Sequence, residues 1–459
     1  MLICPGCGAD LRFSPEKQKL VCDYCDSEFT TKEYNEKKPL GAKEQDDSFA
    51  VNVFTCPQCG GELLTEDDTA ATFCSYCGAS VMLESRIVEQ MKPEFVIPFQ
   101  VSKEDCENAY RKLIRRAGYI PKEMKEDQQI SQFRGIYMPY WNYRFRSWDF
   151  TMEGKQEHRS GDYIIKDSYE LNAQCEGEVS DIYYDASGAF SDHLSEAIAP
   201  FDHNARKPFS PAYLSGFYAD TNDVDSKVYQ SEAMDTANRL VTDEVAKKIS
   251  LPAFGLSKSE AMKKKKVSDQ KPTLAFFPVW FLATRSRDGS RVSYAVVNGQ
   301  TGKIAADLPI DFRKYLWTSL LLALPLFIIL NLLFTFTPFV AVAISMALAA
   351  VGILVAARDT RRIRDRERGA DDKGKLFVEG ASPEPERKGF SPVWLPSIGF
   401  GLGLVLLLLN PAADILFYAV AALISVLVAW TFFTVVRESN RLTTRKLPQL
   451  GKRGGDEHE

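Results

Sequence analysis

Eight cysteines near the start of this 459-residue chain carry the clearest chemistry in the sequence. They form four Cys-x-x-Cys pairs, with fourteen residues between the two pairs of each set, and the second set repeats the first 52 positions later. The eight are Cys4, Cys7, Cys22, Cys25, Cys56, Cys59, Cys74 and Cys77. Four thiolates in two pairs are a ligand set that Zn²⁺ takes tetrahedrally, at about 2.3 Å from each sulfur. The spacing therefore predicts two zinc sites.

The predicted sites are structural, because four protein ligands leave no coordination position for a catalytic water. A redox-active dithiol is the alternative, but it needs a βαβ context that the residues around these pairs lack. Each pair is expected at the tip of a β-hairpin, with strands over 19–22 and 71–74 leading into the second hairpin of each ribbon. Glycine follows three of the four pairs, where the backbone must turn tightly, at Gly8, Gly60 and Gly78.

The N-terminal module is acidic. Residues 1–94 carry 9 Lys and Arg against 17 Asp and Glu, a net charge of −8. Binding to a phosphate backbone needs a basic surface, so nucleic acid is not the expected partner and another protein is. A ribbon of about 30–40 residues is too small to bury a core, so bound zinc would supply its folding free energy.

Residues 95–312 are expected to form a separate α+β domain. Ser102 is a suitable N-cap for a helix that runs to about Ala117, and the dense aromatic side chains of 133–150 are typical of a strand. The other expected elements are strands within 161–184, a helix over 226–249, and a hairpin over 273–285 and 291–306. We interpret the aromatic side chains as core, with a ligand groove as the alternative.

No catalytic constellation is recognisable. The chain has four His, and neither an HExxH nor a GxSxG motif occurs. Two cysteines lie outside the zinc sets, Cys106 and Cys175, and we interpret them as buried thiols rather than as nucleophiles paired with His158 or His203. We therefore assign no catalytic residue and no cofactor besides zinc, which weighs against an enzyme without excluding one.

Four apolar stretches follow the middle domain, each with 17–22 residues and no charge. They cover 316–334, 338–357, 393–409 and 415–436. A bilayer core of about 30 Å needs about 20 helical residues, so the sequence predicts four transmembrane spans. Lys and Arg flank the outer ends of the two predicted helical hairpins, and the first residues show no signal-peptide pattern. The expected location is the cell membrane, multi-pass, with the N-terminal domains, the central loop and the C-terminus in the cytoplasm.

The predicted fold is multi-domain: two tandem small β zinc ribbons, an α+β cytoplasmic domain, and an all-α transmembrane part of two helical hairpins. In chain order the units are ribbon 1 over 1–32, a linker over 33–50, ribbon 2 over 51–85, the α+β domain over 95–312, a transmembrane hairpin over 316–357, a basic loop over 358–392, a second hairpin over 393–436 and a tail over 437–459.

The ribbon sequence resembles a known bacterial family. The resemblance is carried by CPGCGA at Cys4–Ala9 and by the run from Phe13 to Cys25, with shorter matches at Ile97–Phe99, Gly135–Trp141 and Phe277–Trp280. Over about residues 1–312 the chain is similar to membrane proteins described as containing transcription factor IIB-type zinc ribbons. The resemblance implies the same eight zinc ligands and names no reaction.

The leading hypothesis is a membrane-anchored adaptor or scaffold that binds a protein partner at the inner leaflet. One alternative is an enzyme or transport-associated component with a ligand site among the aromatics of 95–312. A second alternative is a nucleic-acid-binding ribbon protein. The expected partners are thus a protein and the lipid bilayer, and the sequence identifies no small-molecule ligand.

Overall fold

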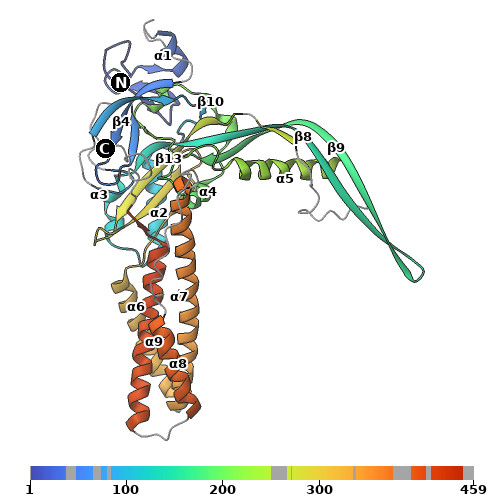
Figure 1. The fold of residues 1–459 in the computed structure, drawn as a ribbon. Coiled ribbons are helices and arrows are strands. Elements are labelled where there is room, and N and C mark those ends of the chain that lie inside the picture. Colours follow the sequence, from blue (N-terminus) through green and yellow to red (C-terminus); the bar gives the residue numbers. More distant parts are fainter. Residues whose placement is uncertain are drawn as a thin grey trace, which may run out of the picture.

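The computed structural model describes residues 2–37, 48–65, 74–79, 84–249, 266–269, 271–333, 338–375, 394–409 and 415–447. A β-rich head carries both cysteine-bearing ribbons, a helical stalk extends from the head, and a long two-stranded arm projects to one side (Figure 1). We call helices α6–α9 the stalk and residues 150–173 the arm. The head is the remainder of the described chain.

Ribbon 1 is a small antiparallel sheet of its own. It consists of β1 (Leu11–Ser14), β2 (Lys19–Cys22) and β3 (Glu28–Phe29), followed by α1 (Thr31–Lys37). The strand predicted over 19–22 is confirmed. Leu11 pairs with Cys22 and is buried with it. Phe13 and Leu20, two residues along each strand, are buried on the same face.

The strands of ribbon 2 belong to the large head sheet. They are β4 (Ser48–Thr55), β5 (Glu62–Thr65) and β6 (Glu84–Met91). β5 pairs with β11 (Tyr218–Asp220), Leu64 opposite Ala219, so ribbon 2 continues directly into the head. The strand predicted over 71–74 lies almost wholly outside the described residues.

Thirteen described strands make up the head sheet, which curls around the core (Figure 1). The main path runs β10–β7–β13–β8–β11–β5–β4–β6, with β14, β15 and β16 beyond β13, and with β9 and β12 paired to β8. The remaining bounds are β7 Phe95–Val96, β8 Arg134–Ser160, β9 Tyr163–Asp185, β10 Lys207–Pro208, β12 Lys266–Asp269, β13 Thr273–Arg285, β14 Arg291–Asn298, β15 Ile304–Ala306 and β16 Arg445–Lys446.

The head helices are α2 (Lys103–Arg116), α3 (Asp127–Ile130), α4 (Asp192–Ile198) and α5 (Gln230–Ile249). The predicted cap of α2 is confirmed, because the Ser102 hydroxyl accepts a hydrogen bond from the Asp105 N–H at 3.2 Å. The hairpin predicted from 273 is also confirmed as β13 and β14, with β15 as a third strand.

Two aromatic clusters fill the core of the head, and β8 contributes to both. Tyr137 lies in the cluster where Phe99 stacks on Phe217 at 4.3 Å between ring centroids. Tyr140 lies in the other cluster and stacks on Phe277 at 4.4 Å. Positions of opposite parity on a strand point to opposite faces, so one aromatic strand serves both clusters. These side chains are core, as the pattern indicated.

The arm is one continuous hairpin. β8 and β9 pair without a break from residues 149 and 174 out to Ser160 and Tyr163, and Gly161 turns the chain with φ at +61°. The sequence predicted a strand ending near residue 150 and separate strands after 161. Residues 151–160 extend β8 because each pairs across the hairpin with a residue of 163–172, although their own sequence is polar.

The predicted transmembrane part of four spans is wrong. The stalk consists of α6 (Phe312–Leu333), α7 (Pro338–Lys375), α8 (Trp394–Leu409) and α9 (Ile415–Leu442). Among the described residues, α7 alone contains a stretch long and apolar enough to cross a membrane, Ala343–Arg362. The architecture is therefore an α+β head with a large curled sheet, joined to a helical stalk.

Helix ends and internal residues explain the difference. α8 has 16 residues. At about 1.5 Å per residue its described part, Trp394–Leu409, covers roughly 24 Å, against a bilayer core of about 30 Å. In α6, Arg313 and Lys314 occupy the first turn, and Pro325 lies inside the helix, where it removes a backbone hydrogen bond. α9 buries polar side chains in its second half, including Thr431 and Thr434. The prediction counted consecutive apolar residues, which takes no account of helix bounds, of charged residues and proline within a helix, or of buried polar side chains.

Candidate metal centres

Each Cys-x-x-Cys pair sits in the same backbone turn. The N–H of the first cysteine donates to the carbonyl five residues later, and the N–H four residues later donates back to the first cysteine's carbonyl. The bonds, at 2.7–3.0 Å, join Cys4 to Ala9 and Gly8, Cys22 to Ser27 and Asp26, Cys56 to Gly61 and Gly60, and Cys74 to Ala79 and Gly78. The cysteines of both ribbons therefore lie in backbone turns of equivalent hydrogen bonding.

The residue after each pair has a left-handed backbone, with φ between +55° and +79°. Three of the four are the glycines that the sequence analysis singled out, Gly8, Gly60 and Gly78. The fourth is Asp26, a position that a search for glycine does not find. Asp tolerates the left-handed region better than most side chains, so this turn keeps its geometry. The offset from the cysteine pair alone would have identified the position.

The four sulfurs of each set converge. In ribbon 1 the sulfurs of the two pairs approach to 3.5 and 3.7 Å, and in ribbon 2 to 3.6 and 3.8 Å. All ligand atoms of each set lie within 4.8 Å of one another. A tetrahedron with zinc–sulfur bonds of about 2.3 Å has sulfurs about 3.8 Å apart. Both tetra-cysteine groups could hold a metal ion, which is consistent with tandem zinc ribbons and compatible with two structural zinc ions.

The two groups differ in burial. All four cysteines of ribbon 2 are buried, whereas in ribbon 1 Cys7 and Cys25 are exposed. In ribbon 1 both turns are open to solvent, at residues 5–8 and 23–26. The equal spacing in the sequence therefore hides two different environments.

Ribbon 2 is held against the hairpin of β13 and β14. The Tyr294 hydroxyl donates to the Tyr76 carbonyl at 2.8 Å, and the Arg285 guanidinium donates to the Cys77 carbonyl. The same guanidinium reaches the Gln58 side chain in the other turn at 2.9 Å. A Cβ at Gly78 would lie 3.3 Å from the Ala283 carbonyl oxygen, so the backbones meet closely here.

Ribbon 1 is attached to the head by its strands rather than by its metal-binding turns. The Phe13 N–H donates to the Ser215 carbonyl at 3.1 Å, and the Phe13 ring meets Tyr213 edge-on at 5.2 Å. The Gln18 side chain donates to the Phe99 carbonyl at 2.6 Å. These contacts fix the buried face and leave the sulfurs of Cys7 and Cys25 at the surface.

The electrostatics of ribbon 1 favour a thiolate at the exposed edge. Cys25 Sγ lies 3.2 Å from Ser27 Oγ. Hydrogen bonding with the Ser27 side chain and with its backbone N–H lowers the pKa of Cys25 to about 6. At Cys7, the other exposed thiol, the Ala9 backbone lowers the pKa but the neighbouring thiols raise it further, so only Cys25 favours the thiolate form that binds metal.

A buried carboxyl lies behind ribbon 2. Asp220 of β11 is buried, and burial raises the pKa of its carboxyl to about 7, with the nearby Asp223 acting in the same direction. The Ser187 hydroxyl and the Thr221 N–H donate to its two oxygens, the latter at 2.9 Å. These bonds satisfy Asp220 within the fold.

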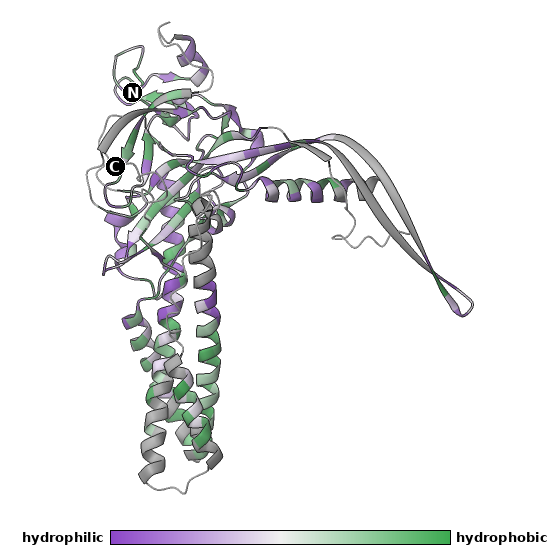
Figure 2. Cartoon of the chain, viewed as in Figure 1, coloured by the Kyte–Doolittle hydropathy of each residue, from purple (hydrophilic) through white to green (hydrophobic). Residues whose placement is uncertain are grey.

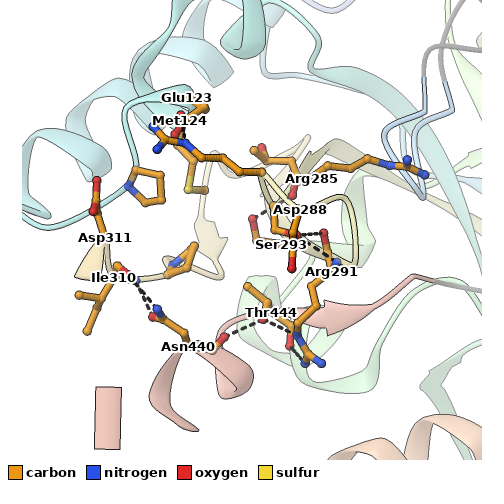
Figure 3. A pocket seen from close by; sticks show the side chains of 15 residues that line it. Glu123, Met124, Arg285, Asp288, Arg291, Ser293, Ile310, Asp311, Asn440 and Thr444 are labelled. Carbon is orange, nitrogen blue, oxygen red and sulfur yellow. Dashed lines mark hydrogen bonds and ion pairs between the residues drawn. The ribbon is translucent and has the colours of Figure 1, made fainter. Parts of the chain in front are cut away.

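A cavity of about 300 Å³ lies where the head meets the stalk (Figure 3). Arg291 of β14 donates to both the hydroxyl and the carbonyl of Thr444 at 2.7 Å. The Asn440 side chain exchanges hydrogen bonds with the backbone of Ile310 at 2.7 and 2.8 Å. No aromatic residue lines this cavity, so it is not the aromatic groove considered for the middle domain. Its polar groups tie the end of α9 to the head.

Of the cysteine and histidine positions weighed for catalysis, Cys106 and His203 are described with resolved surroundings, and neither is activated. Cys106 of α2 is fully buried, and burial raises the pKa of its thiol. His203 stacks on Tyr183 with ring centroids 4.4 Å apart, and burial lowers its pKa. The Cys175 side chain lies outside the described part of the structure. The buried-thiol interpretation of Cys106 is confirmed.

Comparison with known proteins identifies a relative. The chain is 27% identical over 318 residues to YdjG of Bacillus subtilis (strain 168), which is described as an uncharacterized protein. The match covers 68% of this chain and 90% of YdjG. No protein-family profile matches the chain. No solved structure matches it either.

Proposed function

We propose that this protein is a membrane-associated adaptor that holds a zinc-ribbon head beside a lipid bilayer and binds a protein partner there. The observation that carries the proposal is the apolar outer surface of the stalk. The open metal-binding turns of ribbon 1 support the second part of the proposal, the binding of a protein partner.

Large aliphatic side chains face outward along α6 and α7. Leu321, Leu332 and Leu354 are 74%, 81% and 71% exposed. Only 22% of the apolar stretch of α7 is buried within the fold. The apolar colour runs along the described stalk in Figure 2, whereas the head is mixed. A contiguous apolar surface of this extent is unfavourable in water, and lipid would cover it.

Basic residues gather at the head end of the stalk. The Lys314 ammonium donates to the Ile120 carbonyl of the head at 2.7 Å, which places the start of α6 there. Arg362 of α7 lines a cavity together with Asp307 and Thr443 of the head. Positive charge marks the cytoplasmic side of membrane proteins, so we place the head in the cytoplasm. That compartment keeps thiols reduced and available to zinc.

The candidate metal site of ribbon 1 is suited to binding a partner at the protein surface. Ribbon 1 is anchored by its strands and offers both turns to solvent, so zinc would hold a rigid surface ready for a partner. The net charge of −8 over residues 1–94 favours a protein over nucleic acid. We assign zinc to both sites because all-thiolate tetrahedral coordination suits it.

The membrane half of the proposal is tested by Val351→Arg combined with Leu354→Arg, two exposed residues of the apolar stretch of α7. In lipid each arginine costs about 2.5–3.5 kcal/mol or more near the bilayer centre, whereas on a water-exposed helix it is neutral or improves solubility. We expect the variant to leave the carbonate-washed membrane fraction. Ile164→Arg at the arm tip is the matched control, since Ile164 is also an exposed aliphatic residue. Equal membrane retention of the double variant and the control would contradict the proposal.

The adaptor half is tested by affinity purification of the full chain from detergent-solubilised membranes. Cys7→Ser with Cys25→Ser removes two ligands of ribbon 1 at exposed positions. We expect a co-purifying protein to be lost in this variant and kept in Cys106→Ser, whose thiol is outside both metal sites. Partner recovery that does not depend on ribbon 1 would contradict the adaptor role.

A further inference from the structure

One tyrosine recurs in both ribbons in opposite surroundings. The second cysteine pair reads Cys22-Asp-Tyr24-Cys25 in ribbon 1 and Cys74-Ser-Tyr76-Cys77 in ribbon 2. The Tyr76 side chain is 1% exposed and the Tyr24 side chain is 82% exposed. Because the backbone hydrogen bonds of the two turns are equivalent, both tyrosines project from the same kind of frame. One projects into the head and the other into solvent.

The head supplies a receptor for the Tyr76 turn. The Phe281 ring meets the Tyr76 ring edge to face, with centroids 6.0 Å apart. The Tyr294 hydroxyl donates to the Tyr76 carbonyl at 2.8 Å, and Arg285 donates to the next carbonyl, that of Cys77. This receptor therefore combines two aromatic side chains and a guanidinium on one β-hairpin. It donates hydrogen bonds to two successive carbonyls, those of Tyr76 and Cys77.

The corresponding groups of ribbon 1 have no such receptor. Among the residues that the structure describes, none donates a hydrogen bond to the Tyr24 or Cys25 carbonyl, and no ring packs on Tyr24. The flanking positions also differ. Exposed Asp23 and Asp26 stand where ribbon 2 has a buried serine and a glycine. The Tyr24 turn is thus an equivalent surface with two added carboxylates, of which Asp23 lies 3.9 Å from the Arg12 guanidinium.

We infer that the Tyr24 turn, residues 22–26, is the docking surface for a protein partner. The partner presents an aromatic pair on a β-hairpin, with guanidinium donors for the Tyr24 and Cys25 carbonyls. This inference rests on the proposed adaptor function and names its surface and the chemistry of its partner. A second copy of this chain is not the occupant, because its own receptor is filled by Tyr76. Asp23 and Asp26 favour a receptor more basic than the one built around Arg285.

The surface is tested by placing the photoreactive residue p-benzoylphenylalanine at position 24 of the full chain in its native membranes. Position 163 is the matched control, because Tyr163 is equally a solvent-exposed tyrosine, at the arm tip. We expect position 24 to give an adduct with another protein, mapped by mass spectrometry to a β-hairpin that carries aromatic residues and arginine. The adduct yield should fall at least tenfold at 0.5 M salt. Adducts only with lipid, with a second copy of this chain, or with a surface lacking aromatics would overturn the inference.

A second set of variants separates this inference from the adaptor proposal. We expect Tyr24→Ser to lower partner recovery at least tenfold and Tyr24→Phe to leave it within twofold. Both variants should keep two zinc ions and an unchanged Tm, because the Tyr24 ring packs on no described residue. If Tyr24→Ser keeps a partner that Cys7→Ser/Cys25→Ser loses, the docking surface is refuted and the adaptor role stands. If neither variant loses a partner, both proposals fail.

Discussion

Ribbon 1 and ribbon 2 share cysteine spacing, turn geometry and a tyrosine, yet they lie in different surroundings. Ribbon 2 is buried, with β13 and β14 covering its second turn and Arg285 bridging its two turns. Ribbon 1 is fixed by its strands and leaves both turns open. A cysteine turn of one design can therefore be covered by the rest of the fold or left open to solvent.

The largest expected difference follows from removing ligands. We expect Cys56→Ser with Cys59→Ser to lower the Tm of the head by about 10 °C or more, because a loss of about 3 kcal/mol or more shifts Tm by roughly 2–4 °C per kcal/mol in a domain of this size. The buried ribbon 2 is continuous with the head sheet through β5 and β11, so its collapse removes core.

The matched variant Cys7→Ser with Cys25→Ser should lower the Tm by only a few degrees, because these two cysteines are exposed. Thermal unfolding of the detergent-solubilised chain, with zinc content measured on the same samples, checks both variants. Equal losses of Tm would mean that the two ribbons contribute alike.

Glycine substitutions in the two ribbons should change the free energy of unfolding by less than the loss of metal ligands does. Gly78→Ala combines left-handed backbone strain of about 1–2 kcal/mol with a Cβ placed 3.3 Å from the Ala283 carbonyl oxygen. Gly8→Ala has the strain alone, since a Cβ there would meet nothing within 4 Å. Denaturant unfolding should therefore show a larger loss of unfolding free energy for Gly78→Ala. A loss as large for Gly8→Ala would argue against close packing of ribbon 2 on β13.

A further prediction concerns pH and the carboxyl behind ribbon 2. Burial raises the pKa of Asp220 from 3.8 to about 7, so the folded chain binds this proton more tightly than the unfolded chain. The stability contributed by the group is full below pH 3.8 and is lost as the pH rises toward 7. The Tm of Asp220→Asn minus that of the parent should therefore increase between pH 5 and pH 8. A difference that does not change with pH would show that Asp220 is already ionised at the lower pH.

Local features of the fold were predictable, and features made by distant contacts were not. The ligand pairs and the Ser102 cap depend on short spacings, so the sequence alone identified them. The different fates of Tyr24 and Tyr76 depend on Phe281 and Tyr294, about 200 positions away in the chain. The shared cysteine spacing and tyrosine carry none of that information, and the two turns differ in sequence only by Asp23 and Asp26 in place of Ser75 and Gly78.

The predictions for the arm and for the stalk were wrong for related physical reasons. Residues 151–160 are polar, and β8 continues through them only because β9 pairs opposite. In the stalk, each run of apolar residues was equated with a span, although the described part of α8 covers 16 residues and Pro325 lies inside α6. Helix length and interruptions are set by the whole structure rather than by hydropathy in a window.

The most direct test of the central claim is metal extraction from the intact, zinc-loaded protein with a chromogenic chelator under reducing conditions. The claim is that one site is displayed and the other is buried. We predict two phases of one zinc each, with rates at least tenfold apart, and loss of only the fast phase in Cys7→Ser/Cys25→Ser. A single phase releasing both ions, or a fast phase that survives this substitution, would contradict the account.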